Sequence, residues 1–264
     1  MRCTNAATFI FLSLVAVGGA AAAGLPANSE VDVRRAAERR TFSDAEIIDG
    51  FLKIAFGAEF RFGGQSDRIR KYIRPVRVLV DNEASPDRSG EIEAVIDDIR
   101  TRVKNLDISV TPDADEANAV VKLIHDRDLT ETIRALYGGE RTSRIRREHE
   151  PQCLAGYSKD DAFRIQHAEV ILVVDAGDFV FYDCAYEEIL QALGPINDDT
   201  SLPWSMFNDD VSMGFFDVYD QLLLNILYDP RIRPGMTRAE VAAVLPAILP
   251  DVRAFVARTN HLPQ

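Results

Sequence analysis

The chain has 264 residues, of which 47% are apolar, and it carries a formal net charge of −12. This acidic balance disfavours nucleic acid and anionic membrane surfaces as partners, while it permits cationic partners without naming one. A chain of this length and apolar content can bury one substantial core, so we expect one domain with additional peripheral segments.

Residues 1–23 have the features of a secretory signal peptide. One charge, at Arg2, precedes an apolar run from Ala6 to Val17, and a tail of small residues ends just before Gly24. The apolar run is too short to span a bilayer comfortably, and the tail suits signal peptidase. We therefore expect a secreted or periplasmic protein whose mature chain has no transmembrane segment.

The next segment, residues 24–43, is polar and lacks a clean apolar face, which predicts a flexible leader. Apolar residues at helical spacing and short aliphatic runs then predict helices and strands. The expected elements are a helix over 44–56, a strand over 76–80, a helix over 90–106, strands over 108–110 and 117–124, a helix over 128–136 and a strand over 165–174. The basic, polar segment 138–152 predicts a long loop.

A helix over residues 184–193 follows the last strand after a short turn. Asp183 can cap its start and Gly194 can end it. The stripe expected to face the core consists of Ala185, Ile189, Ala192 and Leu193. This orientation leaves Glu187 and Gln191 on the opposite face.

Further apolar runs predict helices near the C-terminus, over residues 211–228, 237–248 and 252–256. Asp209 or Asp210 can cap the first of these helices, and Thr237 with Glu240 forms a capping box for the second. The whole order of elements predicts an α+β domain in which a sheet packs on helices.

Two cysteines follow the predicted signal peptide, Cys153 and Cys184. In an oxidising compartment an even pair is most simply a disulfide, which would tie the loop before a strand to the first turn of the helix over 184–193. The alternative is two separate buried thiols.

The segment from Tyr186 to Asn197 is similar to the metzincin zinc-peptidase helix, H-E-x-x-H-x-x-G-x-x-H, which a Met-turn follows. Glu188 stands at the position of the glutamate and Gly194 at that of the glycine. The three histidine positions instead carry Glu187, Gln191 and Asn197. Downstream, Met206 lies where that family has its Met-turn.

Residues 187–194, 207–210 and 227–236 are more closely similar to a bacterial domain-of-unknown-function family, number 2927, some members of which are described as putative lipoproteins. A lipoprotein needs a cysteine just after the apolar run, whereas Cys3 precedes that run. The resemblance implies a metzincin-like domain over residues 44–236, with a twisted mixed sheet, a cleft along the motif helix, and a C-terminal helical extension over 237–264.

Metzincin chemistry needs three neutral nitrogen ligands for zinc and a glutamate that takes a proton from the bound water. Glutamine and asparagine amides are poor zinc ligands, and Glu187 supplies a single carboxylate. The resemblance therefore implies a degenerate site, in which Glu188 is catalytic only if a metal still binds. Alternatively, Glu187, Glu188 and Gln191 are the solvated face of an amphipathic helix.

Four aspartates follow the motif helix in two loop segments: Asp198, Asp199, Asp209 and Asp210. Carboxylates in loops suit a hard cation such as Ca²⁺ better than zinc. The alternative is that these residues cap turns and helix starts. The sequence alone defines no complete ligand set for either metal.

These observations predict a degenerate peptidase domain with a non-catalytic role in binding or envelope organisation. Its ligand would be a peptide or protein segment in the cleft. One alternative is a metal-dependent peptidase with non-standard ligands, and the other is a structural module stabilised by a cation.

Overall fold

The computed structural model describes residues 29–57, 67–148, 152–195 and 197–263. The predicted signal peptide and Cys3 lie outside the described residues. The described chain is an α+β domain, as the sequence predicted. Its helices are α1 (Ser29–Ala36), α2 (Asp44–Ile54), α3 (Ser89–Arg102), α4 (Leu129–Tyr137), α5 (Gly139–Glu148), α6 (Asp178–Ala192), α7 (Val218–Leu227) and α8 (Arg238–Thr259).

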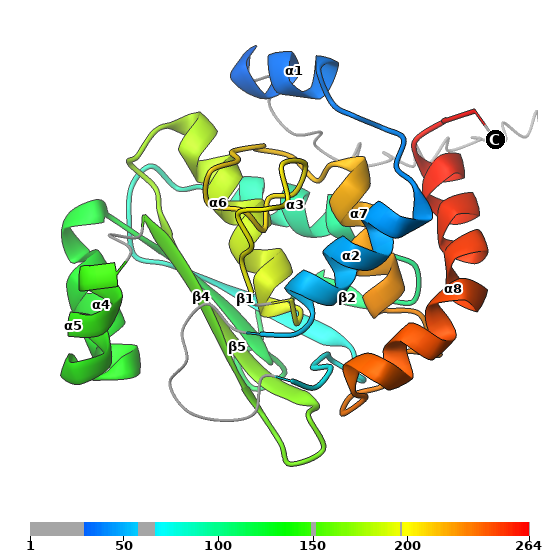
Figure 1. Ribbon diagram of the computed structural model, residues 1–264. Coiled ribbons are helices and arrows are strands. Elements are labelled where there is room, and N and C mark those ends of the chain that lie inside the picture. The colour runs from blue at the N-terminus through cyan, green and yellow to red at the C-terminus, as the bar shows by residue number, and fades with distance from the viewer. Residues whose placement is uncertain (1–28, 58–66, 149–151, 196, 264) are drawn as a thin grey trace, which may run out of the picture.

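A five-stranded mixed sheet crosses the middle of the domain (Figure 1). Its strands are β1 (Val76–Asn82), β2 (Ile108–Val110), β3 (Ala119–Ile124), β4 (Cys153–Lys159) and β5 (Ile165–Val173). The strand order is β2-β1-β3-β5-β4. All neighbours are parallel except β4, which runs antiparallel to β5 at one edge.

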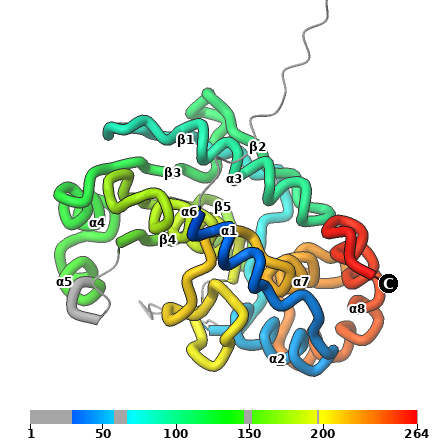
Figure 2. The backbone as a smooth tube through the Cα atoms, turned by 90° about the horizontal axis from the view of Figure 1, so that it is seen from above, coloured from blue at the N-terminus to red at the C-terminus, as the bar shows by residue number. Residues whose placement is uncertain are grey.

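Helices cover both faces of the sheet, and the two layers differ in size (Figure 2). On one face, α4 and α5 enclose a small core with side chains of β3, β4 and β5, in which Ile133 of α4 belongs to the same cluster as Ile124 of β3 and Ile171 of β5. On the other face, α3 and α6 contact the sheet, and α7, α2 and α8 form a further layer beyond them.

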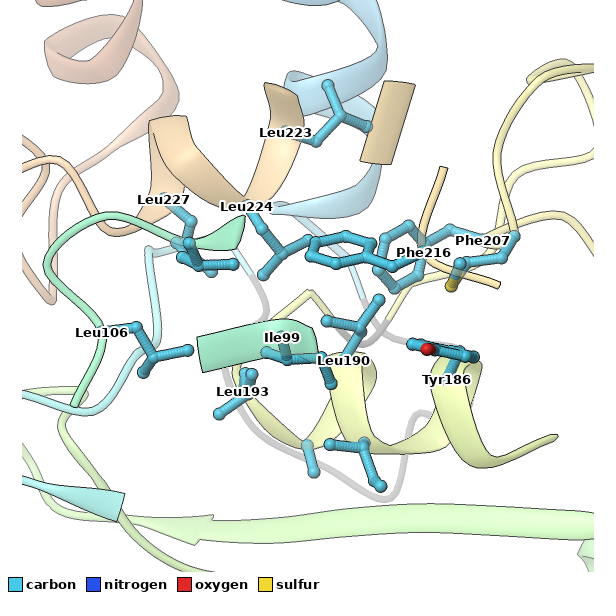
Figure 3. Close-up of a cluster of buried hydrophobic side chains, with 14 of the residues drawn as sticks. Ile99, Leu106, Tyr186, Leu190, Leu193, Phe207, Phe216, Leu223, Leu224 and Leu227 are labelled. Carbon is cyan, nitrogen blue, oxygen red and sulfur yellow. The ribbon is translucent and has the colours of Figure 1, made fainter. Parts of the chain in front are cut away.

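The main core lies between α3, α6 and α7. Tyr186 and Leu190 of α6 lie near Phe207 and Phe216 of the following loop and Leu224 of α7 (Figure 3). All five side chains are buried. The buried residues of α8 belong to the same core, so the expected C-terminal extension packs as part of the domain.

The predicted loop over 138–152 is wrong for most of its length. Residues 139–148 form α5, and β4 begins at Cys153. Neither element has a strong apolar pattern: α5 reads GERTSRIRRE, with Ile145 as its buried apolar residue. Strand β4 obtains its stability from pairing with β5, which local sequence does not reveal.

The motif helix begins earlier than predicted, because α6 runs from Asp178. Asp183 is therefore inside the helix and does not cap it. Its Oδ1 instead accepts hydrogen bonds from the backbone N–H groups of Met213 (2.6 Å) and Gly214 (2.9 Å). This contact fastens the long loop after α6 to the helix.

The helix predicted over 211–228 is shorter, because α7 begins at Val218. Asp217 is its N-cap and accepts from the N–H groups of Tyr219 and Asp220, so neither Asp209 nor Asp210 has that role. The two predicted C-terminal helices form one continuous α8, with Thr237 and Glu240 in the predicted capping box.

Where the sequence predicts a flexible leader, residues 29–43 include α1 and contact the body of the domain. Arg34 stacks on Phe179 at 4.5 Å and donates to the carbonyl of Ser212 at 2.6 Å. Arg35 stacks on Phe215 at 4.7 Å. These contacts are made by guanidinium groups, so an apolar pattern in the sequence does not predict them.

No helix in the described part of the chain has the length and apolar content needed to cross a membrane.

Candidate functional site

Helix α6 carries the motif residues into the interior. Glu188 is 6% exposed and Gln191 is 2% exposed, although both were expected to be solvated if the helix were simply amphipathic. That alternative is wrong, because β4 and β5 cover one side of α6 while α3 and the following loop cover others. Burying two polar side chains costs free energy unless they have hydrogen-bonding partners, so this cost depends on the polar groups around them.

Three carboxylate groups converge beside α6. One oxygen each from Glu187, Asp198 and Asp209 lies within 4.8 Å of the other two. Glu187 comes from α6, while the two aspartates come from separate parts of the loop that follows it. Ca²⁺ binds oxygen at about 2.3–2.6 Å, so oxygens on opposite sides of one ion lie about 5 Å apart. The separation of the three oxygens fits a single ion of this class.

Gln191 is hydrogen-bonded to one member of this cluster, Asp198. Its Nε2 donates to both carboxylate oxygens of Asp198, at 3.0 and 3.2 Å. Burial and the neighbouring charge of Asp209 raise the pKa of Asp198 to about 7, in spite of the hydrogen bonds from Gln191. A buried acid beside a second acid is disfavoured in its charged form, and a bound cation would reverse that preference.

The other predicted ligand residues do not join the cluster. Asn197 donates through Nδ2 to the carbonyls of Lys53 (3.1 Å) and Asp198 (3.2 Å), which holds the loop against the end of α2. Asp199 accepts hydrogen bonds from the N–H and hydroxyl of Ser201. Asp210 is exposed and outside the group of converging carboxylates.

The segment that resembles a Met-turn is anchored on α7. Ser205 Oγ donates to Asp220 Oδ1 at 2.6 Å, and the N–H of Met206 donates to Asp220 Oδ2 at 2.8 Å. Met206 is buried at 2% exposure. These bonds fix the start of the segment that carries Asp209. Asp220 is not among the predicted site residues, although a lone acid inside the apolar run 218–227 is a signal for it.

Asp220 lies beside Asp217, and both are buried. Burial is the main cause of the raised pKa of each carboxyl group, and the charge of Asp220 raises that of Asp217 further. Two buried carboxyl groups in contact do not both ionise readily, and hydrogen bonds from Ser205 and Met206 favour the charged form of Asp220 over that of Asp217.

A disulfide joins the motif helix to the sheet edge. Cys153 of β4 and Cys184 of α6 form the bridge, with their Cα atoms 5.9 Å apart, so the predicted pairing is confirmed.

Glu188 follows Cys184 by one helical turn. Its charge and that of Glu169 reinforce the effect of burial, which raises the pKa of Tyr137 above its ordinary value. Glu188 therefore lies close enough to the Tyr137 hydroxyl for its charge to act on that group.

Zinc does not fit the residues at the motif positions. Gln191 and Asn197 use their amide N–H groups in hydrogen bonds to oxygen atoms, and neither offers an imidazole. Two described histidines are engaged elsewhere: His125 Nδ1 lies 3.3 Å from Asp175, and His167 Nε2 lies 2.8 Å from Glu169. The converging donors are all carboxylate oxygens, which hard cations prefer.

Comparisons with known proteins agree with this description at the level of family. No curated protein and no solved structure matches the chain. A family model described as a protein of unknown function, DUF2927, matches residues 44–247. This match covers α2 through the first ten residues of α8, including the sheet, the motif helix and the loop that carries Asp198 and Asp209. The chain belongs to the DUF2927 family.

Proposed function

We propose that this chain is a non-catalytic binding domain on a metzincin-like scaffold, in which a hard divalent cation takes the place of zinc. The observation that carries the proposal is the convergence of Glu187, Asp198 and Asp209. Glu187 stands at the first histidine position of the motif, and Asp198 follows the third by one residue. The motif frame thus still directs side chains to one point, with oxygen donors instead of imidazoles.

The fold supports the metzincin-like part of this proposal. The sheet is mostly parallel, the motif helix α6 follows β5 directly, and the Met206 segment packs in the core beyond it. This is the arrangement that the sequence resemblance implies. The replaced ligands argue against zinc-dependent peptide hydrolysis, since they do not hold the zinc ion whose bound water Glu188 would activate.

The cation would join three segments that otherwise repel one another. Glu187, Asp198 and Asp209 are all acidic, and the two aspartates belong to a loop without helices or strands. Binding would neutralise this repulsion and fix the loop against α6. The edge of the sheet at β4, next to the disulfide, would then lie beside a loop of fixed conformation. Strand β4 pairs only with β5 among the described residues, so its outer edge is available to an extended peptide.

Export from the cytoplasm is part of the proposal. The sequence features of residues 1–23 indicate a signal peptide, and the Cys153–Cys184 disulfide suits an oxidising compartment. Expression of the full chain in a bacterial host, followed by N-terminal sequencing of the exported product, should find a start at Gly24. An uncleaved N-terminus in the cytoplasmic fraction would contradict export.

Isothermal titration of Ca²⁺ into chelator-treated protein tests the cation site. We expect one site per chain, which Glu187→Gln and Asp198→Asn each weaken by at least about tenfold, because even supporting residues of metal sites contribute about 10–100-fold to affinity. Asp210→Asn is the matched control and should change the affinity by less than about twofold. Equal binding by all four proteins would place the cation elsewhere.

A peptidase assay separates this proposal from the enzymatic alternative. Wild-type protein and Glu188→Gln should both leave an unstructured peptide intact, with or without added Zn²⁺ or Ca²⁺. Chelator-sensitive hydrolysis that disappears in Glu188→Gln would instead establish a peptidase with non-standard ligands.

A further inference from the structure

A basic pocket lies where the arm formed by residues 29–43 passes the ends of α3 and α8. Its volume is about 270 Å³. Its lining includes four basic side chains and one acid: Arg35, Arg40, Arg102, His261 and Glu38. Three of these side chains are arginines, on a chain whose net charge is −12. The pocket is separate from the acidic cluster and shares no residue with it.

Arg35 differs from its two neighbouring arginines in lacking a counter-ion. Arg40 Nε lies 2.9 Å from Glu38, and Arg102 Nε lies 2.6 Å from Asp98. In the described part of the chain, Arg35 has no carboxylate partner, and its buried Nε has no hydrogen-bond partner. Its guanidinium stacks on Phe215, which fixes the plane of the group. A guanidinium that lines a pocket and has no carboxylate partner there is a preferred binding group for an oxyanion.

An apolar groove adjoins the basic pocket and shares Arg40 and His261 with it. The groove has a volume of about 710 Å³ and is lined by residues of α7, α8 and the segment 40–42. Its apolar lining includes Phe42, Val218, Leu222, Ala254, Ala257 and Leu262. Its volume is within the range of about 300–1,000 Å³ that is usual for small-molecule sites.

We propose that the basic pocket and the apolar groove together bind a single-chain amphiphile with an oxyanion head. The head, a carboxylate or a phosphate, would lie against the Arg35 guanidinium, and the aliphatic chain would extend along α8. Charge complementarity selects the head, because Arg35 is the pocket's arginine that has no carboxylate partner among the described residues. Burial of the methylene groups in the groove would supply the remaining affinity.

Titration calorimetry with dodecanoate and dodecyl phosphate, below their micellar concentrations, tests this inference and distinguishes the two heads. We expect 1:1 binding of at least one of them. Dodecanol should bind at least about tenfold more weakly because it lacks the charge, and inorganic phosphate should bind more weakly because it lacks the chain.

Variants then locate the site. Arg35→Gln should weaken binding by about tenfold or more, since a hydrogen-bonded charge is lost. Ala257→Phe should abolish binding by filling the groove. Arg258→Gln, an exposed arginine of the same helix outside both pockets, is the matched control and should bind as the wild type does.

Two results would overturn the proposal: unchanged affinity in both Arg35→Gln and Ala257→Phe, or dodecanol and dodecanoate binding equally well. Circular dichroism establishes that each variant is folded. If Arg35→Gln does not fold, Ala257→Phe and the comparison of ligands on wild-type protein still decide the question.

Discussion

Asp217 and Asp220 show how buried acids can hold a site together without facing it. Asp217 caps α7, and Asp220 holds the N–H of Met206 and the hydroxyl of Ser205. Both have raised pKa values, chiefly because of burial. The folded protein therefore keeps protons that the unfolded chain releases above about pH 4.

This pair predicts a pH dependence of stability. Because the folded-state pKa values are raised, the stability that the pair contributes is fully present below about pH 4 and is lost as the pH rises. Asp217→Asn should reduce this loss, since Asn caps helices about as well as Asp and its amide can donate to Asp220. Urea unfolding at several pH values between 4.5 and 8 measures the effect.

The expected result is a smaller fall in the free energy of unfolding for Asp217→Asn, with equal or greater stability than wild type at pH 8. Asp210→Asn, at an exposed position, is the control and should follow the wild-type curve. An Asp217→Asn curve parallel to that of wild type would show that the pair does not titrate in this range.

At the scale of elements, the contact between α6 and β4 positions the motif. The disulfide from Cys153 to Cys184 closes a loop of 31 residues, which contains β5 and the first turns of α6. On the loop-entropy model a closure of this size stabilises the folded state by about 3–4 kcal/mol.

We expect Cys153→Ala with Cys184→Ala to lower the free energy of unfolding by about 3 kcal/mol. Reduction of the wild-type protein with dithiothreitol should lower it by a similar amount and should leave the double variant unchanged. If wild-type stability is indifferent to reductant, the bridge contributes nothing to the fold.

Strong periodic patterns allowed most of the elements to be predicted. The predictions for α2, α3 and β5 rest on repeated apolar residues, and the structure has these elements within a few residues of the expected limits. Strand β4 and α5 were missed, because pairing with β5 and packing on the sheet stabilise them rather than local propensity. The apolar patterns also gave no indication that Arg70 and Lys71 are buried and donate to backbone carbonyls.

The candidate site could be predicted in part. Resemblance to the metzincin helix indicated Glu187 and Gln191, and composition indicated the four aspartates. Which aspartates approach Glu187 depends on how the loop after α6 folds. Hydrogen bonds from Ser205 and Met206 to Asp220 help to set that path, and partners so distant in sequence are not visible in a local pattern.

At the scale of the whole molecule, segments from both ends of the chain stabilise the region around the site. The arm at residues 29–43 contacts the loop after α6: Arg34 binds Ser212, and Arg39 stacks on Trp204 at 5.2 Å. Helix α8 extends the core on α7, which in turn holds the Met206 segment. The loop that carries Asp198 and Asp209 is therefore held from several sides, although its described residues form no helix or strand.

The most direct measurement is a crystal structure of the chain grown with Mn²⁺, a hard cation whose anomalous scattering identifies it. We expect one anomalous peak between Glu187, Asp198 and Asp209, at about 2.0–2.4 Å from the carboxylate oxygens. Absence of a peak there at millimolar Mn²⁺, with the three side chains well ordered, would contradict the cation site and leave the domain as a binding fold without a metal.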